Sequence, residues 1–256
     1  LSLARAADVV VENFRAGALD RLGLGYDVLA EANPKLVYCS ITGFGQDGPY
    51  ASRAGYDYII QGMSGMMSVT GDPSGQPQKV GVAVVDLLTG IYGVAGILAA
   101  LHQRERTGQG QHVDMALLDV GMAVLANQAM NYLIGGTAPQ RLGNAHPNIV
   151  PYQVFPASDG HLIIACGNDR QFAALCQALD LGDLAADPAF ATNPARVGNR
   201  ATLCARIAAA TAARTRADIL SVLERAGVPA GPINTVGDAL AEPQIVSRRL
   251  EIELDG

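Results

Sequence analysis

The sequence reads VGVAVVDLLTGIYGVAGILAAL from Val80 to Leu101. This stretch is long and apolar enough to suggest a membrane span, but it contains Asp86 and four glycines. Because an aspartate at the membrane centre costs roughly 2.5–3.5 kcal/mol, we interpret the stretch as protein core. We expect a buried strand over Val80–Val85 and then a long helix, whose apolar side chains recur at helical intervals. The Gly-containing segment Arg104–Gly110 is expected to end that helix.

The same alternation of strand and helix occurs on both sides of this stretch. Ala7–Glu12 and Lys35–Ile41 are short runs rich in β-branched residues, and Tyr26–Ala32 between them has helical spacing. Tyr56–Met67 is also helical in pattern, and Gln111–Leu117 resumes as a strand. Alternating elements of this kind are typical of an α/β domain. We therefore predict a Rossmann-like α/β domain with a largely parallel sheet.

The composition changes at Gly135–Pro151, which is rich in Gly, Asn and Pro. Beyond it, Tyr152–Phe155 and His161–Cys166 flank Ser158-Asp-Gly160, a pattern that predicts a β-hairpin. Helical patterns occur at Asp169–Leu179, Ala201–Ala213 and Arg216–Ala226. We predict a large α/β domain over 1–147, a smaller α+β domain over 148–240, and the start of a return to the large domain over 241–256.

The composition argues against several classes of partner. The chain has 256 residues, 49% of them hydrophobic, a formal net charge of −6 and lysines only at positions 35 and 79. No basic stripe is available to neutralise a phosphate backbone, so we expect no nucleic acid. The four cysteines form no C-x-x-C pair and the four histidines no H-x-x-x-H pair, so neither a metal site nor a disulfide framework is indicated. With no targeting segment recognised, we expect a cytoplasmic protein that does not enter membranes.

Two other features suggest sites of a different kind. Gly43-Phe-Gly-Gln-Asp-Gly48 satisfies G-x-G-x-x-G after a strand, but Pro49-Tyr-Ala-Ser52 does not read as the helix that a dinucleotide site requires, so a loop is favoured. No P-loop or G-x-S-x-G motif occurs. His146 lies in a loop of Gly, Asn and Pro near the predicted domain junction, where either a structural role or a place in a pocket is compatible with the sequence.

Asp86 is a charge inside an apolar run, and two explanations are open. An aspartate is a favourable N-cap residue, because its side chain accepts hydrogen bonds from the first helical turn. Open α/β sheets also place their ligand crevice where a strand ends and a helix begins. The two roles are compatible if one carboxylate oxygen faces the crevice.

Six phrases occur in order between residues 11 and 111. They are Val11-Glu-Asn-Phe-Arg-Ala-Gly17, Asp20-Arg-Leu-Gly-Leu24, Ile41-Thr-Gly-Phe-Gly45 with Gly48-Pro49, Gly55-Tyr-Asp57, Asp86-Leu-Leu-Thr-Gly90 and Arg106-Thr-Gly-Gln-Gly-Gln111. Together they resemble the class III CoA-transferase family, which includes formyl-CoA transferase, the carnitine CoA-transferases and α-methylacyl-CoA racemase. Weaker matches continue to Gly231-Pro-Ile233, so the resemblance covers nearly the whole chain.

The resemblance implies a role for individual residues. Asp86 matches the catalytic aspartate that becomes acylated, and Tyr56 matches a tyrosine beside the active site. Arg53 lies one position away from a lysine that binds CoA in formyl-CoA transferase. The residues that match a CoA-binding segment are Asn13, Phe14, Ala18, Arg21 and Leu22. Coenzyme A, as an acyl-CoA, is therefore the expected ligand, and no metal is implied.

The resemblance also implies a reaction. A family member of the transferase type moves CoA from an acyl-CoA, with succinyl-CoA as the first candidate donor, to a small carboxylic acid through an aspartyl anhydride and an aspartyl-CoA thioester. Family members use a glycine-rich loop for the oxyanions, and Gly143 or Gly167-Asn168 is the nearest substitute here. They form interlocked homodimers, so a homodimer is expected.

Two alternatives to a transferase remain. A racemase needs a base on each face of the substrate, and Tyr56 stands where the racemases have a histidine, although Asp57 and Asp169 offer acids. The family also has a further strand–helix–strand unit before the first strand here and a helical return after the last residues. The large domain is therefore expected to be incomplete at its N-terminus, and a non-catalytic CoA-binding fragment is the second alternative.

Overall fold

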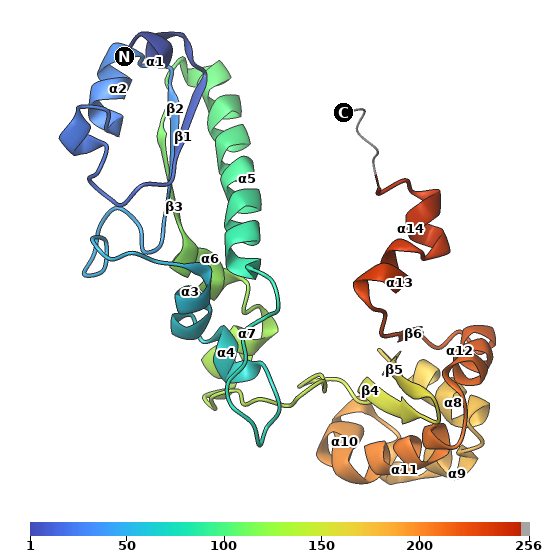
Figure 1. Ribbon diagram of the computed structural model, residues 1–256. Coiled ribbons are helices and arrows are strands. Elements are labelled where there is room, and N and C mark those ends of the chain that lie inside the picture. The colour runs from blue at the N-terminus through green and yellow to red at the C-terminus, as the bar shows by residue number, and fades with distance from the viewer. Residues whose placement is uncertain (252–256) are drawn as a thin grey trace. The chain divides into compact units, whose positions relative to one another are not determined.

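The computed structural model describes residues 1–251 and divides the chain into two compact units, 1–143 and 144–256 (Figure 1). The division falls four residues before the boundary that the sequence predicted. The predicted return to the large domain over 241–256 stays a prediction, and its last part, 252–256, lies outside the described residues.

The first unit is built on a three-stranded parallel sheet in the order β1-β2-β3. Its strands are β1 (Val9–Glu12), β2 (Val37–Thr42) and β3 (His112–Ala116). Strand β2 pairs with both neighbours, with Val9 opposite Val37 and Tyr38 opposite His112. The predicted α/β class with a parallel sheet is confirmed. All three strands point the same way, so their carboxyl ends form one edge of the sheet.

One long helix, α5, packs along a face of this sheet (Figure 1). Gly93 and Gly96 of α5 face the sheet. A Cβ at Gly96 would lie 2.9 Å from the side chain of Val113. The missing side chains therefore allow the helix backbone to approach closely. The helices of the unit are α1 (Ser2–Ala6), α2 (Tyr26–Ala32), α3 (Asp57–Met63), α4 (Met66–Val69), α5 (Val84–Thr107), α6 (Leu117–Ala123) and α7 (Asn127–Gly135), with a 3₁₀ turn at Asp20–Leu22.

The structure corrects two predicted elements of this unit. The apolar run Val80–Val85 is not a strand, because α5 already begins at Val84 and the N–H of Val80 donates to the side chain of Gln61. A short apolar run does not by itself distinguish a strand from the start of a helix. The predicted helix over Tyr56–Met67 is two helices, α3 and α4, separated by Gly65 with φ of +91°.

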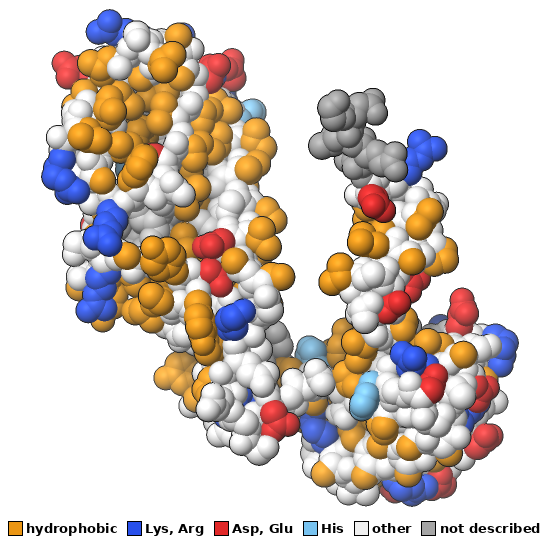
Figure 2. All heavy atoms as spheres, viewed as in Figure 1, with side chains coloured by type: hydrophobic (Ala, Val, Ile, Leu, Met, Phe, Trp, Pro, Cys, Tyr) orange, Lys and Arg blue, Asp and Glu red, His pale blue; other side chains and the backbone are white. Residues whose placement is uncertain are grey.

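The face of α5 that does not contact the sheet is apolar. By length and composition α5 could span a membrane, and so could α6 and α7 if that bent pair formed one span. The exposed side chains on this face follow one another at intervals of about one helical turn and are Leu87, Ile91, Val94 and Leu98. Figure 2 shows apolar side chains gathered over this unit. The expectation of a protein that does not enter membranes stays a prediction.

The second unit is an antiparallel sheet covered by helices. Its strands β4 (Tyr152–Ala157), β5 (Gly160–Ala165) and β6 (Ala230–Pro232) form a sheet in the order β4-β5-β6, and β4 and β5 form the predicted hairpin. One continuous apolar core lies between this sheet and the helices. The helices are α8 (Asp169–Ala178), α9 (Gly182–Ala186), α10 (Asn193–Gly198), α11 (Arg200–Ala212), α12 (Arg216–Arg225), α13 (Val236–Leu240) and α14 (Pro243–Ser247), with a 3₁₀ turn at Pro188–Phe190.

Arg196 is a fully buried charged side chain of this unit. Its guanidinium donates to the carbonyl oxygens of Val150 and Phe190 at 2.8 and 2.9 Å, and to Oδ1 of Asp169 at 2.7 Å. Its Cζ also lies 4.5 Å from the ring centroid of Phe172. One buried side chain therefore connects α8, α10, the 3₁₀ turn before α10 and the segment that leads into β4. Asp169, one of the two acids that the sequence offered for a racemase, forms this ion pair through Oδ1.

Replacing Arg196 should destabilise the second unit far more than replacing its acidic partner. Arg196→Met keeps the volume but leaves the two carbonyl oxygens unpaired, and we expect a loss of about 2–5 kcal/mol in the free energy of unfolding. Asp169→Asn should cost less than this, because the amide oxygen can still accept from Arg196 and the side chain of residue 169 is largely exposed. Urea unfolding followed by circular dichroism measures both, and equal losses would contradict this account of the arginine.

Candidate active site

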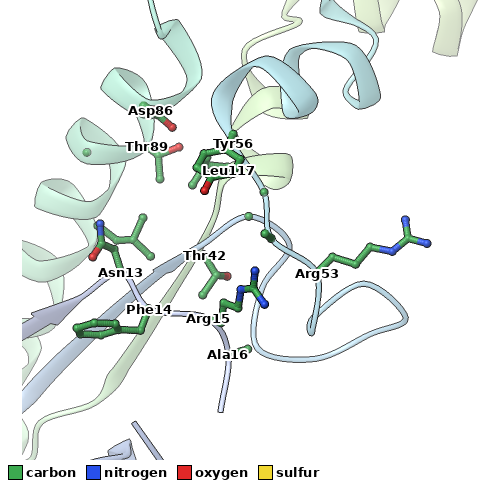
Figure 3. Close-up of a pocket in the computed structure, with 15 residues that line it drawn as sticks. Asn13, Phe14, Arg15, Ala16, Thr42, Arg53, Tyr56, Asp86, Thr89 and Leu117 are labelled. Atoms are coloured by element: carbon green, nitrogen blue, oxygen red, sulfur yellow. The ribbon is translucent and has the colours of Figure 1, made fainter. Parts of the chain in front are cut away.

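A pocket of about 500 Å³ opens at the carboxyl edge of the parallel sheet (Figure 3). Asn13 and Phe14 reach it directly after β1, Thr42 and Gly43 at the end of β2, and Leu117 directly after β3. The other lining residues are Arg15, Ala16, Ile41, Arg53, Ala54, Gly55, Tyr56, Asp86, Thr89 and Gly90. The sheet therefore brings together segments that are distant in the sequence, at the edge where α/β sheets bind ligands.

The first two turns of α5 form one wall of the pocket. Figure 3 shows Asp86 and Thr89 projecting from α5 toward the side that carries Tyr56 and Leu117. Thr89 is buried, and its hydroxyl donates to the carbonyl oxygen of Val85 at 2.7 Å. That bond fixes the side chain one turn after the aspartate. The Asp86 side chain itself is exposed and accepts no hydrogen bond from residues 1–251.

Two glycines let the loop before α3 reach the end of β2. A Cβ at Gly43 would lie 2.5 Å from the Cα of Gly55, and a Cβ at Gly55 would meet Gly43 equally closely. The carbonyl oxygen of Gly43 also accepts from the N–H of Leu118 at 3.1 Å. Direct backbone contact at this point holds Tyr56 and Leu117 at the same pocket. Both glycines thus have a steric reason to lack a side chain.

The capping role that the sequence suggested for Asp86 is wrong. Asp86 lies in the first turn of α5, whose N-cap residue is Ala83. Asp57, from the start of α3, caps the helix instead: its Oδ1 accepts from the N–H groups of Val85 and Asp86 at 2.8 and 3.4 Å. Sequence position alone did not reveal this, because the cap comes from a different helix.

The electrostatic surroundings of Asp86 make it less acidic than an ordinary aspartate. Partial desolvation by the neighbouring structure raises the pKa of Asp86, and the negative charge of Asp57 raises it further. Arg15 and Arg53 bring positive charge to the pocket lining. Arg53 packs over the ring of Tyr50, with its Cζ 4.0 Å from the centroid, and Figure 3 shows its guanidinium directed away from the pocket.

The structure brings together five of the eight predicted site residues. Asn13, Phe14, Arg53, Tyr56 and Asp86 line the one pocket. The other three do not contact it: Ala18 lies further along the loop after β1, and Arg21 and Leu22 lie in the exposed 3₁₀ turn. The CoA-binding role of all these residues stays a prediction.

His146 has structural contacts in the second unit. Its Nδ1 accepts from the N–H of Asn148 at 3.1 Å, and its ring packs against Tyr152. Its carbonyl oxygen accepts from Arg200 at 2.7 Å. Desolvation lowers the pKa of His146, and the charge of Arg200 lowers it further. These contacts favour the structural role of the two that the sequence left open.

The two candidate glycine segments for an oxyanion site have their backbone donors occupied. The N–H of Gly143 donates to the carbonyl oxygen of Gly71 at 3.1 Å. The N–H of Gly167 donates to Oε1 of Gln171 at 2.8 Å, and the Asn168 side chain caps α8. In this arrangement neither glycine has a free N–H for an oxyanion.

Three of the residues that the sequence did not assign to the site bear directly on its chemistry. Arg15 and Thr89 line the pocket, and Asp57 holds the helix that carries Asp86. Thr89 was recognisable as a neighbour of Asp86, because residues three apart share a helix face. Arg15 directly follows Phe14 in a matched phrase. The contact of Asp57 with α5 spans about thirty positions, and no local pattern signals it.

The sequence profile described as CoA-transferase family III matches residues 1–256. The chain belongs to this family. A succinate–glutarate CoA-transferase of Agrobacterium fabrum is 56% identical over 253 residues, which cover 99% of this chain and 63% of that protein. An acetyl-CoA:oxalate CoA-transferase of Acetobacter aceti is 44% identical over 257 residues, or 100% of this chain and 66% of that protein.

Solved structures of the same kind are also similar to this family III chain. A CAIB/BAIF family protein from Brucella suis has a TM-score of 0.83 and 58% identity, over 98% of this chain and 66% of that one. The Mycobacterium tuberculosis protein Rv3272 has a TM-score of 0.88 and 32% identity, over 99% of this chain and 67% of that one. The chain thus spans about two thirds of the length of these relatives.

The Gly43–Gly55 contact predicts a sharp difference between two glycine substitutions. Gly43→Ala would press a methyl group into the backbone of Gly55, and we expect a loss of about 1–3 kcal/mol in stability. Gly81→Ala meets no atom within 4 Å and should change stability by less than about 0.5 kcal/mol. Thermal unfolding of both variants tests the contact, which a tolerated Gly43→Ala would rule out.

Proposed function

We propose that the protein containing this chain transfers CoA from an acyl-CoA donor to a small carboxylic acid, with Asp86 as the nucleophile. The observation that carries the proposal is the Asp86 carboxylate, which lies unbonded within the described residues at a pocket on the carboxyl edge of the sheet, in a family III chain. The similar transferases from Agrobacterium and Acetobacter act on succinate, glutarate, oxalate or acetyl-CoA by their names. We propose succinyl-CoA as donor and a small dicarboxylate as acceptor.

The proposed reaction begins with two steps at Asp86. An oxygen of the carboxylate attacks the carbonyl carbon of the donor thioester, the C–S bond breaks, and CoA leaves as a thiolate. The product is a mixed anhydride between Asp86 and the donor acyl group. The thiolate then attacks the Asp86 carbonyl carbon, the bond to the donor carboxylate breaks, and Asp86 becomes an aspartyl-CoA thioester.

Two further steps regenerate the enzyme. The acceptor carboxylate attacks the aspartyl thioester and expels the CoA thiolate, which gives a second mixed anhydride. The thiolate attacks the acyl carbon of the acceptor, and the Asp86 carboxylate leaves. The cycle needs no net proton or electron transfer. The raised pKa of Asp86 favours the first attack, because a more basic carboxylate is the stronger nucleophile once ionised.

The positive side chains support a carboxylate or phosphate ligand. Arg15 and Arg53 line the pocket, and a guanidinium can bind either anion with two parallel hydrogen bonds, although Arg53 would have to turn toward the pocket to do so. Phe14 is exposed beside them and can pack on an apolar or adenine surface. We propose that Asn13, Phe14, Ala18, Arg21, Leu22, Arg53 and Tyr56 contact CoA when it is bound.

The racemase alternative receives less support. Tyr56 stands at the position of the racemase histidine, and Asp169 is held by the fully buried Arg196 at 2.7 Å. Asp57 is also committed to hydrogen bonds with α5. Both acids that the sequence offered as a second base therefore have other partners, Asp57 through both oxygens and Asp169 through Oδ1.

Trapping tests the covalent step directly. When the protein containing this chain is mixed with succinyl-CoA and hydroxylamine, we expect a hydroxamate at Asp86, because hydroxylamine captures both acylated forms of the aspartate. Mass spectrometry of the peptide that carries residue 86 measures it, and Asp86→Asn serves as the matched control. A protein that binds CoA but remains unmodified would support the non-catalytic alternative and overturn the proposal.

We also propose a cytoplasmic homodimer. All four cysteines are free and buried, as a reducing compartment permits. The exposed apolar face of α5 supports an interface, because large apolar patches on one protein often mark contacts with another. The acyl-CoA site would then lie in a protein with two copies of this chain.

The homodimer predicts the effect of one charge on α5. Ile91→Lys places an ammonium group on the apolar face and should shift the protein from dimer toward monomer. Gln103→Lys, on an already polar part of the same helix, should leave the dimer unchanged. Light scattering during size-exclusion chromatography measures both masses. A monomeric unmodified protein would contradict the proposal.

A further inference from the structure

The Asp57 carboxylate connects two helices at the pocket. It lies at the start of α3 and is only 9% exposed. Its Oδ1 accepts from the N–H of Val85 at 2.8 Å and from the N–H of Asp86 at 3.4 Å. Ala83, the N-cap residue of α5, has no side-chain acceptor. A charged cap at a helix N-terminus is favourable, so α5 begins where Asp57 holds it.

Gln61 extends this connection by one helical turn. Its side chain is fully buried, and its Nε2 donates to Oδ2 of Asp57 at 2.7 Å. Its Oε1 accepts from the N–H of Val80 at 2.8 Å, and its Nε2 also lies 3.5 Å from the carbonyl oxygen of Val82. Asp57 and Gln61 together hold the backbone from residue 80 to residue 86 against α3. Each oxygen of both side chains accepts a hydrogen bond.

This arrangement determines what the Asp86 carboxylate is free to do. An aspartate in the first turn of a helix tends to bond back to the free N–H groups of that turn. Here Asp57 occupies those N–H groups, and the Asp86 carboxylate faces the pocket beside Thr89 (Figure 3). The side chain that caps α5 and the side chain at the pocket are thus two different aspartates.

We propose that Asp57 is a positioning residue for acyl transfer, which holds the first turn of α5 and leaves the Asp86 carboxylate free to attack the thioester. The inference rests on the proposed role of Asp86. Asp57 acts through Asp86 and does not itself form a bond to substrate. Gln61 acts with it by completing the hydrogen bonds of the buried carboxylate.

Asp57 also affects the charge state of its neighbour. The charged and titratable side chains around Asp86 are Asp57 from α3 and Tyr56 before that helix, and Arg15 and Arg53 line the pocket further away, with the Arg53 guanidinium directed out of it. Asp57 is the acidic one, and its charge contributes to the raised pKa of Asp86. Only ionised Asp86 is a nucleophile, so trapping falls as the pH drops through this pKa. Neutralising Asp57 therefore lowers the pKa of Asp86, and the decrease in trapping rate moves to lower pH.

The test compares trapping rates in Asp57→Asn with those in the double variant Asp57→Asn/Gln61→Glu. The single variant places an amide NH₂ against the NH₂ of Gln61, and we expect trapping of Asp86 to slow roughly 10- to 100-fold because the first turn of α5 shifts. In the double variant the new carboxylate accepts from the new amide and from the N–H of Val80. We expect it to recover most of the rate.

The pH profile separates positioning from a general loss of structure. In Asp57→Asn the acid limb of the trapping rate should move to lower pH, and in the double variant it should move back, because a negative charge returns beside α5. A purely structural defect would lower the rate at every pH without moving the limb. Circular dichroism confirms that each variant is folded at the temperature of the assay.

The outcomes distinguish this inference from the proposed function. If the unmodified protein is not trapped at Asp86, the proposed function fails. If it is trapped, and Asp57→Asn is trapped at the same rate with the same pH profile, the positioning role alone is overturned. A slow single variant that the second substitution does not rescue, with an unmoved acid limb, would also overturn it.

Discussion

Strand β2 forms hydrogen bonds with a parallel neighbour on each side, and the location of the pocket depends on that pairing. Parallel pairing places the ends of β1, β2 and β3 at one edge, so Asn13, Thr42 and Leu117 become neighbours. The Gly43–Gly55 contact adds the loop before α3 at the same place, and the Asp57 cap adds the first turn of α5. Asp86 thus reaches the sheet edge through a side-chain contact between helices, with no strand leading directly into its helix.

The periodic elements of the chain could be predicted from the sequence, for physical reasons that are local. Strands β1 and β2 lie within or next to their predicted runs, and the β4–β5 hairpin is explained by apolar alternation around an Asp-Gly turn. The strand predicted at Val80–Val85 was wrong because its main support was an apolar run, which the start of a buried helix can also show. The tertiary hydrogen bonds from Asp57 and Gln61 decide that segment, and local preference does not include them.

The residues of the site could be predicted only in part, because local sequence identifies a segment but not the direction of its side chains. Asp86 and Tyr56 stand in phrases shared with the family, and both reach the pocket. The loop after β1 matched equally well in sequence, yet only its first residues line the pocket, while Arg21 and Leu22 turn away in a 3₁₀ turn. A matched phrase identifies which segment serves a site. Which of its side chains face the pocket depends on backbone turns that the phrase does not specify.

Helix α5 is held at both of its ends, and this has a mechanical consequence. At the far end from Asp57, Arg104 forms an ion pair with Asp8 at 3.0 Å and donates to the carbonyl oxygen of Lys35 at 3.3 Å. The 24 residues of the helix make a rod about 36 Å long. Sliding of this rod along its axis would carry Asp86 away from the sheet edge, but it requires the contacts at both ends to break together. The contacts at the opposite edge of the sheet therefore help to keep the Asp86 carboxylate at the pocket.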